Sequence, residues 1–377
     1  MSSSRIPVAL VITELDFGGA EQCLVHIARG LDSSRFAVEV YVLAPPPKAP
    51  VDGLLTQLRA AQVPCHFLGL DHIWQFPQAV ARLRGRLGGK RRVVLSFLFH
   101  ANVVAAMALH GSSNTVLACG IRVADPSRWR QWVERRALRR AAKVVCVSHA
   151  VARFAASRLR VDHARLTVIP NGIDPSSMRD VPPVELASLG VPAQRRALVV
   201  VARLTHQKGI DELLRAAGPL LTALPHHDLV LVGQGPALPY LRQLATDLGN
   251  ADRVHFAGWR TDVPAILKAS DLLLLPSRYE GMPNVVLEAM ACRRPVVCTR
   301  AEGVGELLGP LSDAQTVPIG DAQAFVNKVL ALINDPVKLS QLAAGNQRRA
   351  EQHFARNVMV QAYADLLQTL NSGLLQP

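Results

Sequence analysis

Two cations in the second half of the chain are placed to bind a diphosphate. The apolar run 197–203 ends in Arg203, and Lys208 follows five residues later, just before a predicted helix. An arginine fork and a lysine point charge at the end of a strand can together neutralise phosphate groups. Two solvated surface cations would have the same sequence, but ligands of parallel sheets bind at strand ends, which favours phosphate binding.

Two glutamates in the stretch 272–297 suit hydroxyl groups. Glu280 lies on a loop after a buried strand, a helix opens near Asn284, and Glu288 lies one turn inside that helix. The first N–H groups of the helix, from Asn284 to Val286, form an anion site. Because carboxylates do not bind phosphate, the natural partners of the glutamates are the hydroxyls of a sugar ring and a ribose. The acid and base of a glycosidase are the alternative, which leaves the two cations without a role.

Two places in the first half could also contact a ligand. Gly18 and Gly19 lie between a strand-like run and a predicted helix, where backbone N–H groups can cradle a phosphate or sugar hydroxyls. A tight turn without a ligand has the same pattern. His100 follows the apolar run 93–99, and a lone histidine in such a run is usually a core residue.

The charge of the chain is unevenly distributed. Its 377 residues, enough for two domains, include 42 Lys and Arg against 29 Asp and Glu, for a formal net charge of +13. Residues 1–175 hold 23 basic and 11 acidic side chains, and the remainder hold 19 and 18. The excess suggests phosphorylated substrates, anionic membranes or nucleic acid as partners. An aromatic content of only 5% and the lack of a recognisable nucleic-acid-binding motif argue against nucleic acid.

The cysteines and the first apolar run indicate a cytoplasmic protein. Six cysteines occur without a CxxC pair, and several lie in strand-like apolar runs, as expected of reduced core residues. The apolar run 6–12 is too short, and too soon followed by acidic residues, for a signal peptide or a membrane span.

Strand-like and helical segments alternate along the chain, as in βαβ units built around parallel sheets. The predicted strands are 7–13, 37–44, 93–99, 115–121, 143–148 and 166–170 in the first half, and 197–203, 228–233, 254–258, 272–276 and 295–299 in the second. The turn-rich segment 171–183 between them predicts a linker. The fold class is therefore α/β, with two Rossmann-like domains facing across a cleft and ligands at the carboxyl ends of strands.

With these motifs the sequence resembles the retaining nucleotide-sugar glycosyltransferases of the GT-B fold, family 4, also called group 1. The resemblance covers essentially the whole chain. The motifs that carry it are GGAE (18–21), VSHAV after the strand 143–148, IPNGID (169–174), VARL with QKG (200–209), VGQGP (232–236), and Glu280 with Glu288 as the E-x7-E pair.

The resemblance implies a role for each candidate residue. Arg203 and Lys208 match the pair that neutralises the donor diphosphate. Glu288 matches the carboxylate on the nucleotide ribose, Glu280 matches the carboxylate on the donor sugar, and His100 matches a histidine that reaches the transferred sugar. The other residues that match donor contacts are Gly18, Gly19, Gly233, Asn284 and Val285. The segment that lines the nucleotide base matches Gly258, Trp259 and Arg260. Glu306 departs from the family pattern, because the glycine pair that commonly precedes the matching glutamate is absent here.

The resemblance also implies an organisation and a reaction. An acceptor-side domain spans 1–174, a donor-binding domain spans 175–355, and a helix over 356–377 crosses back to the first domain. The reaction is a retaining transfer of a sugar from a nucleotide-diphosphate donor to a hydroxyl of a glycan or lipid-linked acceptor, in polysaccharide or glycolipid synthesis. Because the sequence contains no D-x-D motif, we expect no metal and no other cofactor, with the cations and the helix start stabilising the leaving group. The alternative is a basic GT-B scaffold that binds membrane or nucleic acid without transferase activity.

Two basic segments, 82–92 and 128–143, stand out in the first half. A helix over 128–143 would place Trp129 and Trp132 on one arc of about 140° together with most of its cations. Those cations are Arg128, Arg135, Arg136, Arg139, Arg140 and Lys143. Tryptophan among arginines is expected where a helix lies on anionic headgroups, and a solvated basic face with tryptophans in a groove fits equally well. The expected location is therefore cytoplasmic, either in solution or on the cytoplasmic face of a membrane.

Overall fold

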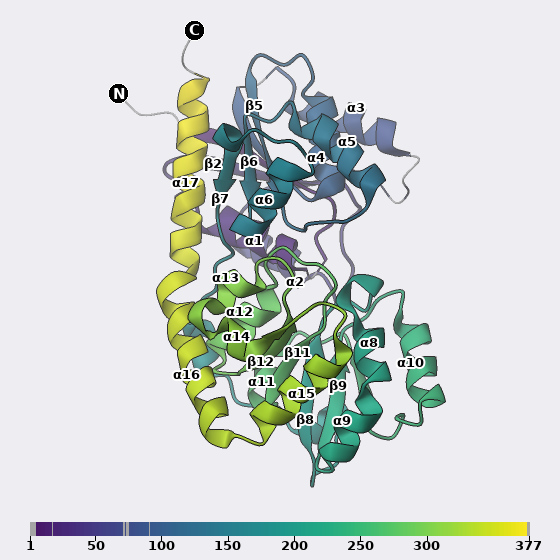
Figure 1. Cartoon of the computed structure of the whole chain (residues 1–377). Helices are drawn as coiled ribbons and strands as arrows, with labels where there is room; N and C mark the ends of the chain where they lie inside the picture. The colour runs from purple at the N-terminus through teal and green to yellow at the C-terminus, as the bar shows by residue number, and fades with distance from the viewer. Residues whose placement is uncertain (1–4, 17, 71, 73–74, 90, 375–377) are drawn as a thin grey trace. The chain divides into compact units, whose positions relative to one another are not determined.

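The computed structural model describes residues 5–16, 18–70, 72, 75–89 and 91–374 (Figure 1). The chain forms two compact units, and each has its own parallel sheet. Unit 1 comprises the residues up to Gly172 together with those from Arg356 onward, and unit 2 is Ile173–Ala355. The predicted α/β class with two Rossmann-like units is therefore confirmed.

Unit 1 contains a seven-stranded parallel sheet in the order β3-β2-β1-β4-β5-β6-β7. The strands are β1 (Ile6–Ile12), β2 (Phe36–Val42), β3 (Cys65–Phe67), β4 (Arg92–Phe97), β5 (Thr115–Ile121), β6 (Lys143–Cys146) and β7 (Leu166–Val168). The chain winds outward from β1 in one direction and from β4 in the other. The switch point of unit 1 therefore lies between the carboxyl ends of β1 and β4, where ligands of such sheets bind.

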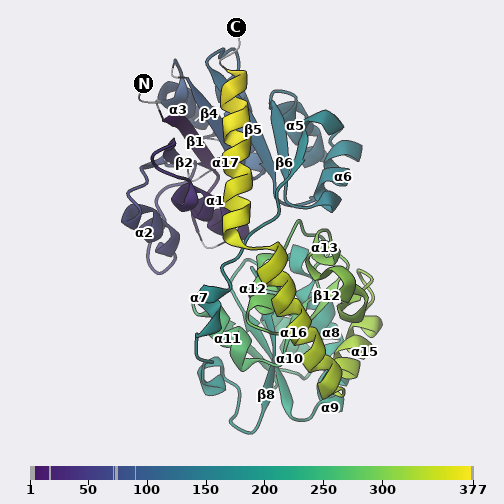
Figure 2. The ribbon, with the colours of Figure 1, turned by 90° about the vertical axis from the view of Figure 1, so that its left-hand side faces the viewer.

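Helices cover both faces of this sheet (Figures 1 and 2). On one face lie α1 (Gly19–Gly30), α2 (Gly53–Ala60) and α17 (Arg356–Gly373), and on the other α3 (Phe76–Leu87), α4 (Phe99–Ala108) and α5 (Arg128–Leu138). Near β6 and β7 lies α6 (His149–Ser157). The alternation along β4 explains this arrangement, because Leu95 and Phe97 join the core under α1 and α17 while Ser96 donates a hydrogen bond to Asn102 of α4.

The chain leaves unit 1 after Gly172 and returns at Arg356. In unit 1, the backbone N–H of Gly172 lies 3.1 Å from the sulfur of Met359 in α17. In unit 2, Ile173 forms an isolated parallel bridge with Ala355. The two ends of unit 2 are therefore adjacent in space.

Unit 2 contains a six-stranded parallel sheet in the order β10-β9-β8-β11-β12-β13. The strands are β8 (Arg196–Val201), β9 (His227–Val232), β10 (Val254–Gly258), β11 (Leu272–Leu275), β12 (Val296–Thr299) and β13 (Thr316–Val317). The switch point of unit 2 lies between β8 and β11.

The helices of unit 2 also lie on both faces of its sheet (Figure 2). One face packs against α8 (Ile210–Arg215), α9 (Ala217–Ala223), α10 (Leu238–Asp247) and α15 (Ala322–Ile333). The other is covered by α11 (Val263–Ala269) and α12 (Asn284–Ala291), with α16 (Pro336–His353) packed along α12. The remaining helices are α7 (Ser176–Arg179), α13 (Val304–Leu308) and α14 (Ser312–Gln315).

All eleven predicted strands are present, but several boundaries differ. The predicted strand 93–99 ends at Phe97, because Leu98 adopts φ 74° and α4 begins at the next residue. The predicted helix 128–143 ends at Leu138, so Lys143 is the first residue of β6 and does not share the arc of the helix. The short strands β3 and β13 were not predicted, since runs of three and two residues carry no detectable alternation.

In the part of the chain that the structure describes, no helix combines the length and the apolar character needed to cross a bilayer. All six cysteines are free thiols, and five of them are buried.

Candidate functional site

The switch point of unit 2 is formed by two loops in direct contact, one after β8 and one after β11. Gly209 adopts φ 61°, and a Cβ atom added there would lie 2.1 Å from the carbonyl oxygen of Pro276. The backbone N–H of Arg278 donates to the carbonyl of Gln207 at 2.8 Å, and the amide side chain of Gln207 donates to the carbonyl of Tyr279 at 2.9 Å. Glycine at position 209 thus permits the close approach that brings the two predicted motifs together.

Lys208 and Glu280 meet at this switch point. The Nζ atom of Lys208 lies 2.5 Å from Oε1 of Glu280, and the hydroxyl of Ser277 donates to the same oxygen at 2.7 Å. The side chains are only 19% and 6% exposed, respectively. A predicted phosphate-binding cation and a predicted sugar-binding carboxylate therefore form a partly buried ion pair.

The loop after β12 holds Glu280 from the other side. Glu302 accepts a hydrogen bond from the backbone N–H of Glu280 at 3.0 Å. The next residue, Gly303, has φ 74°, and a Cβ atom there would lie 2.1 Å from the carbonyl oxygen of Gly281. The sequence analysis considered Glu306 and missed Glu302. The available signal was that Glu302 stands before Gly303, where the family commonly has a second glycine.

Arg278 anchors the same loop to α8. Its guanidinium group lies 2.9 Å from Asp211 and 2.8 Å from Glu212. Burial raises the pKa of Asp211, but hydrogen bonds from Arg278 and Arg215 outweigh it and lower that pKa to about 2. Arg278 was not predicted, because its partners lie more than sixty residues away in the sequence.

Glu288 differs from Glu280 in having no such partners. It lies in the second turn of α12, half-buried, and burial raises its pKa to about 7. Among the residues that the structure describes, none donates a hydrogen bond to its carboxyl group or forms an ion pair with it. A carboxyl group in this state can accept hydrogen bonds from ligand hydroxyls.

The start of α12 and Arg203 complete the predicted phosphate contacts. Asn284 and Val285 are the first two residues of α12, and no side chain caps this helix start. Arg203 lies two residues beyond the end of β8, on an exposed part of the loop that leads to Lys208.

The predicted base-binding segment follows β10. Gly258 ends the strand with φ 69°, Trp259 follows it, and the guanidinium group of Arg260 forms two hydrogen bonds with Asp262, at 2.8 and 2.7 Å. The backbone N–H of Gly233 donates to the carbonyl of Gly258 at 2.7 Å. A Cβ atom at Gly233 would also lie 1.9 Å from the carbonyl oxygen of Ala202, so this glycine is required by loop packing.

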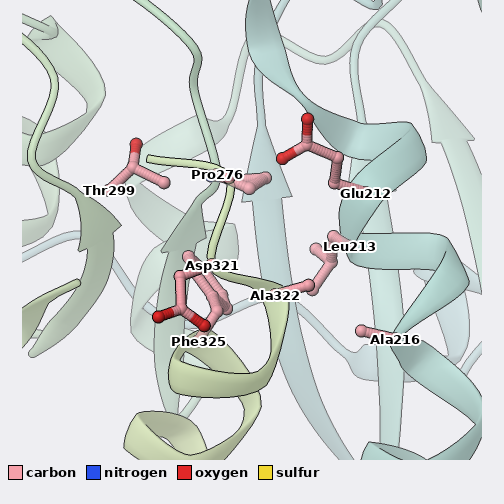
Figure 3. A pocket seen from close by; sticks show the side chains of 9 residues that line it. Glu212, Leu213, Ala216, Pro276, Thr299, Asp321, Ala322 and Phe325 are labelled. Carbon is pink, nitrogen blue, oxygen red and sulfur yellow. The ribbon is translucent and has the colours of Figure 1, made fainter. Parts of the chain in front are cut away.

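A small cavity lies near these loops, on the α8 and α15 side of the sheet (Figure 3). Pro276 and Thr299 at two strand ends contribute to it, together with apolar side chains such as Leu213 and Phe325. The carboxylates of Glu212 and Asp321 border it. None of the predicted donor contacts lines this cavity.

In unit 1, His100 lies at the switch point but in the first turn of α4 rather than at a strand end. Its ring makes an edge contact with Phe99, with ring centroids 5.1 Å apart. Burial and the nearby charge of Arg130 lower the pKa of His100, and Glu14 in the loop after β1 opposes this shift. His100 is therefore held toward its neutral form, in which one ring nitrogen can accept a hydrogen bond.

The GGAE loop carries a carboxylate, which changes the kind of ligand that we expect this loop to bind. Gly18 directly precedes α1, which begins at Gly19, and Glu21 is a buried residue of the first turn of this helix. A Cβ atom at Gly18 would lie 2.2 Å from Oε2 of Glu21. A carboxylate over this loop disfavours phosphate and favours hydroxyl groups as ligands.

The two tryptophans of α5 are exposed rather than tucked into a groove. Trp129 and Trp132 are each 59% exposed. The guanidinium group of Arg136 lies 4.3 Å from the ring centroid of Trp132, and that of Arg130 lies 5.8 Å from the ring of Trp129. We define the α5 face as Arg128, Trp129, Trp132, Arg136, Arg139 and Arg140, all of which are exposed.

The second basic segment, 82–92, is largely occupied with structural contacts. Arg92 is buried and pairs with Glu39 at 3.1 Å, so it does not contribute to an exposed surface. Arg84 donates to the last carbonyls of α4, at Met107 and Ala108. Lys90 lies outside the described residues.

The net charge divides sharply between the two units. Unit 1 carries 24 basic and 11 acidic side chains, whereas unit 2 carries 18 of each. Within the described ranges, no group of three or more His, Cys, Asp or Glu side chains could hold a metal ion.

Two family models match the chain. The model described as Glycosyltransferase Family 4 matches residues 17–177, and the model described as Glycosyl transferases group 1 matches residues 195–335. The two matches fall in unit 1 and unit 2, respectively, apart from the first few residues of unit 2.

Curated relatives and solved structures agree with these matches. The chain is 34% identical over 188 residues to the lipopolysaccharide core biosynthesis glycosyltransferase LpsD of Rhizobium meliloti, covering 50% of this chain and 54% of that protein. It is 29% identical over 215 residues to an Escherichia coli UDP-Gal:alpha-D-GlcNAc-diphosphoundecaprenol alpha-1,3-galactosyltransferase, covering 55% of each. The chain thus spans about half the length of the curated relatives it matches. The crystal structure of Anabaena HepE in complex with UDP-glucose superposes with a TM-score of 0.82 at 25% identity, over 97% of this chain and 100% of that chain.

Proposed function

We propose that this chain, which belongs to the group 1 glycosyltransferases of family 4, transfers a sugar from a nucleoside-diphosphate donor to a hydroxyl group of an acceptor. The observation that carries the proposal is the pairing of Lys208 with Glu280 at the switch point of unit 2. It joins a cation suited to the donor diphosphate and a carboxylate suited to the donor sugar. Glu288, without a protein partner among the described residues, suits the ribose hydroxyls.

In the proposed reaction, the bond between the anomeric carbon and the phosphate oxygen breaks, and negative charge develops on the departing diphosphate. Arg203, Lys208 and the N-terminus of α12 stabilise that charge. The acceptor hydroxyl attacks from the face that the phosphate leaves, and its proton passes to the leaving phosphate oxygen, so the anomeric configuration is retained. On the family resemblance, His100 contacts the transferred sugar.

Donor binding is the direct test of this function. A ligand that binds only the folded state raises its stability, by about 2.7 kcal/mol at one hundred times the Kd. We expect a nucleotide sugar to raise the Tm of the wild-type chain and not that of Lys208→Ala. UDP-glucose and UDP-galactose are the first donors to test, since UDP appears in the names of two similar proteins, followed by GDP- and ADP-sugars. The absence of a shift with every donor would overturn the proposal.

We further propose that the reaction needs no divalent metal. The cations of Arg203 and Lys208 supply the positive charge that a metal ion provides in other transferases. Transfer measured after treatment with EDTA should match transfer in untreated enzyme. Loss of activity on chelation, restored by Mg²⁺ or Mn²⁺, would contradict this part of the proposal.

The acceptor side is proposed to face an anionic membrane in the cytoplasm, with a glycan or lipid-linked acceptor. The α5 face supports this, because exposed indoles among arginines suit the boundary between headgroups and acyl chains. Each arginine near an anionic surface contributes about 1 kcal/mol. One similar protein is named for an acceptor linked to diphosphoundecaprenol.

Vesicle co-sedimentation tests the membrane proposal. The wild-type chain should sediment with phosphatidylglycerol vesicles and remain in solution with phosphatidylcholine vesicles. Glutamine at Arg128, Arg136 and Arg139 should reduce sedimentation, whereas glutamine at three exposed arginines of unit 2, Arg242, Arg293 and Arg348, should not. Equal loss in both triple variants would indicate a general charge effect, and salt-sensitive binding to DNA without vesicle binding would favour the alternative of a nucleic-acid-binding scaffold.

A further inference from the structure

We propose that Glu280 competes with the donor diphosphate for Lys208, and that this competition makes the site prefer nucleotide sugars to free nucleoside diphosphates. The inference rests on the proposed function and assigns a selectivity to the same site. It follows from the position of Lys208, which forms a partly buried ion pair with Glu280.

The ion pair is strong because it is short and shielded. The Lys208 and Glu280 atoms lie 2.5 Å apart, with side chains 19% and 6% exposed. At such low exposure, charges attract more strongly than at a surface, and separating them without replacement is costly. A diphosphate can therefore engage Lys208 fully only by weakening the bond to Glu280.

The consequence for Glu280 depends on what accompanies the diphosphate. With a free nucleoside diphosphate, the hydroxyl of Ser277 is the one side-chain partner that the carboxylate keeps among the described residues, and the desolvation penalty of a buried charge remains. With a nucleotide sugar, the sugar hydroxyls donate to the same carboxylate and offset the lost ion pair. The free diphosphate thus binds at a disadvantage that the intact donor does not have.

Glu280 cannot avoid this competition by moving away. Its backbone N–H is bound by Glu302, and the preceding carbonyl, at Tyr279, accepts from Gln207. Gly303 packs against the following carbonyl, at Gly281. Since neighbouring loops hold Glu280 on both sides, the carboxylate stays within reach of Lys208.

The same competition favours release of the product. Once the sugar has moved to the acceptor, the remaining nucleoside diphosphate no longer satisfies Glu280, and the ion pair with Lys208 can form again. In the part of the chain that the structure describes, no cation pairs with Glu288, so Glu288 should bind the nucleotide equally well with or without the sugar. This difference makes Glu288 the matched control.

Calorimetric titration of UDP and UDP-glucose, with GDP and GDP-mannose as a second pair, tests the inference. Glu280→Gln keeps the shape of the side chain and an acceptor for Ser277, but removes the charge. We expect it to tighten binding of the nucleoside diphosphate about tenfold and to weaken binding of the nucleotide sugar, so that the preference for the sugar form collapses. Glu288→Gln should weaken both ligands by the same factor.

A double variant tests whether the effect of Glu280→Gln depends on Lys208. In Lys208→Met, the additional change Glu280→Gln should no longer tighten binding of the diphosphate, because the competition has been removed. Circular dichroism and Tm of each variant establish that it is folded. Equal weakening of both ligands by Glu280→Gln, or no change in either, would overturn the inference. Failure of the wild-type chain to bind any of the four ligands would instead overturn the proposed function.

Discussion

The switch points of the two units follow the same winding rule but are built differently. In unit 2, loops from neighbouring strands interlock, and Lys208 and Glu280 already form an ion pair within a unit of zero net charge. In unit 1, His100 and Glu14 are near the switch point, while most of the excess positive charge lies elsewhere, including the α5 face. On the proposed function, a phosphorylated ligand would be bound by a few placed charges in a neutral unit rather than by a large net charge.

Removing Lys208 should have the largest effect, because it deletes the cation and leaves Glu280 buried without an ion-pair partner. We expect kcat/KM of Lys208→Ala to fall by a factor of about 10² to 10³, from a loss of roughly 3 to 4 kcal/mol of transition-state stabilisation. Arg203→Ala should also reduce kcat/KM. As a control, Arg242→Ala removes an exposed cation outside the switch point of unit 2 and should leave turnover unchanged. Near-normal turnover in both Lys208→Ala and Arg203→Ala would contradict the proposal that these cations stabilise the leaving diphosphate.

Gly303→Ala should disrupt the interlocked loops of unit 2. The added Cβ atom would meet the Gly281 carbonyl oxygen at 2.1 Å in a backbone conformation of φ 74°. We expect the free energy of unfolding in urea to fall by about 2 to 4 kcal/mol, with weaker donor binding. Gly249→Ala has similar strain at φ 68° but no atom within 4 Å, so it should cost only about 1 kcal/mol. Equal losses in the two variants would show that the loop contact contributes nothing.

Glu288 should make donor binding depend on pH, whereas a buried glutamate in unit 1 should not. Burial raises the pKa of both Glu288 and Glu134 from 4.5 to about 7. Because ribose hydroxyls donate to the ionised carboxylate, donor affinity should rise several-fold between about pH 6 and 8. Glu288→Gln should flatten this titration, measured calorimetrically, and Glu134→Gln should leave it unchanged. An unchanged pH profile in Glu288→Gln would show that Glu288 does not contact the donor.

The same two glutamates affect stability in the opposite direction. Since the folded chain holds these protons more tightly than the unfolded chain, their contribution to stability is fully present below about pH 4.5. It is lost as the pH rises through about 7. Urea unfolding at several pH values should show a smaller decline over this range in either glutamine variant, since each variant lacks one of the two titrating carboxyls.

Changes on the α5 face should have the smallest effect on the folded state. Trp132 is 59% exposed and stacks against only one arginine. We expect Trp132→Ser to change the free energy of unfolding by less than about 0.5 kcal/mol, while reducing sedimentation with anionic vesicles. A loss above about 2 kcal/mol would indicate that this indole supports the fold.

Local patterns predicted the strands and singled out Lys208 and Glu280, which the structure brings together, because parallel strands and the loops after them have strong periodic and compositional signals. The roles of these two residues stay predictions. Contacts between loops were not predictable in the same way. Ser277, Arg278 and Glu302 act through partners that only the sheet order brings close, such as Asp211 for Arg278. The helix over 128–143 was predicted too long because Arg165, from a different element, donates to the carbonyl of Leu138, the last residue of α5, and to that of Ala141 beyond it.

The bridge between Ile173 and Ala355 suggests that unit 2 can be removed or exchanged as one piece. Unit 2 is a continuous insertion whose first and last residues are neighbours, so its excision leaves a gap that a short linker can close. On the proposed function, this insertion would let the unit that binds the donor in one transferase be grafted onto the acceptor-side unit of another. Recombination between related genes at these two junctions would generate new pairings of donor and acceptor without altering either core.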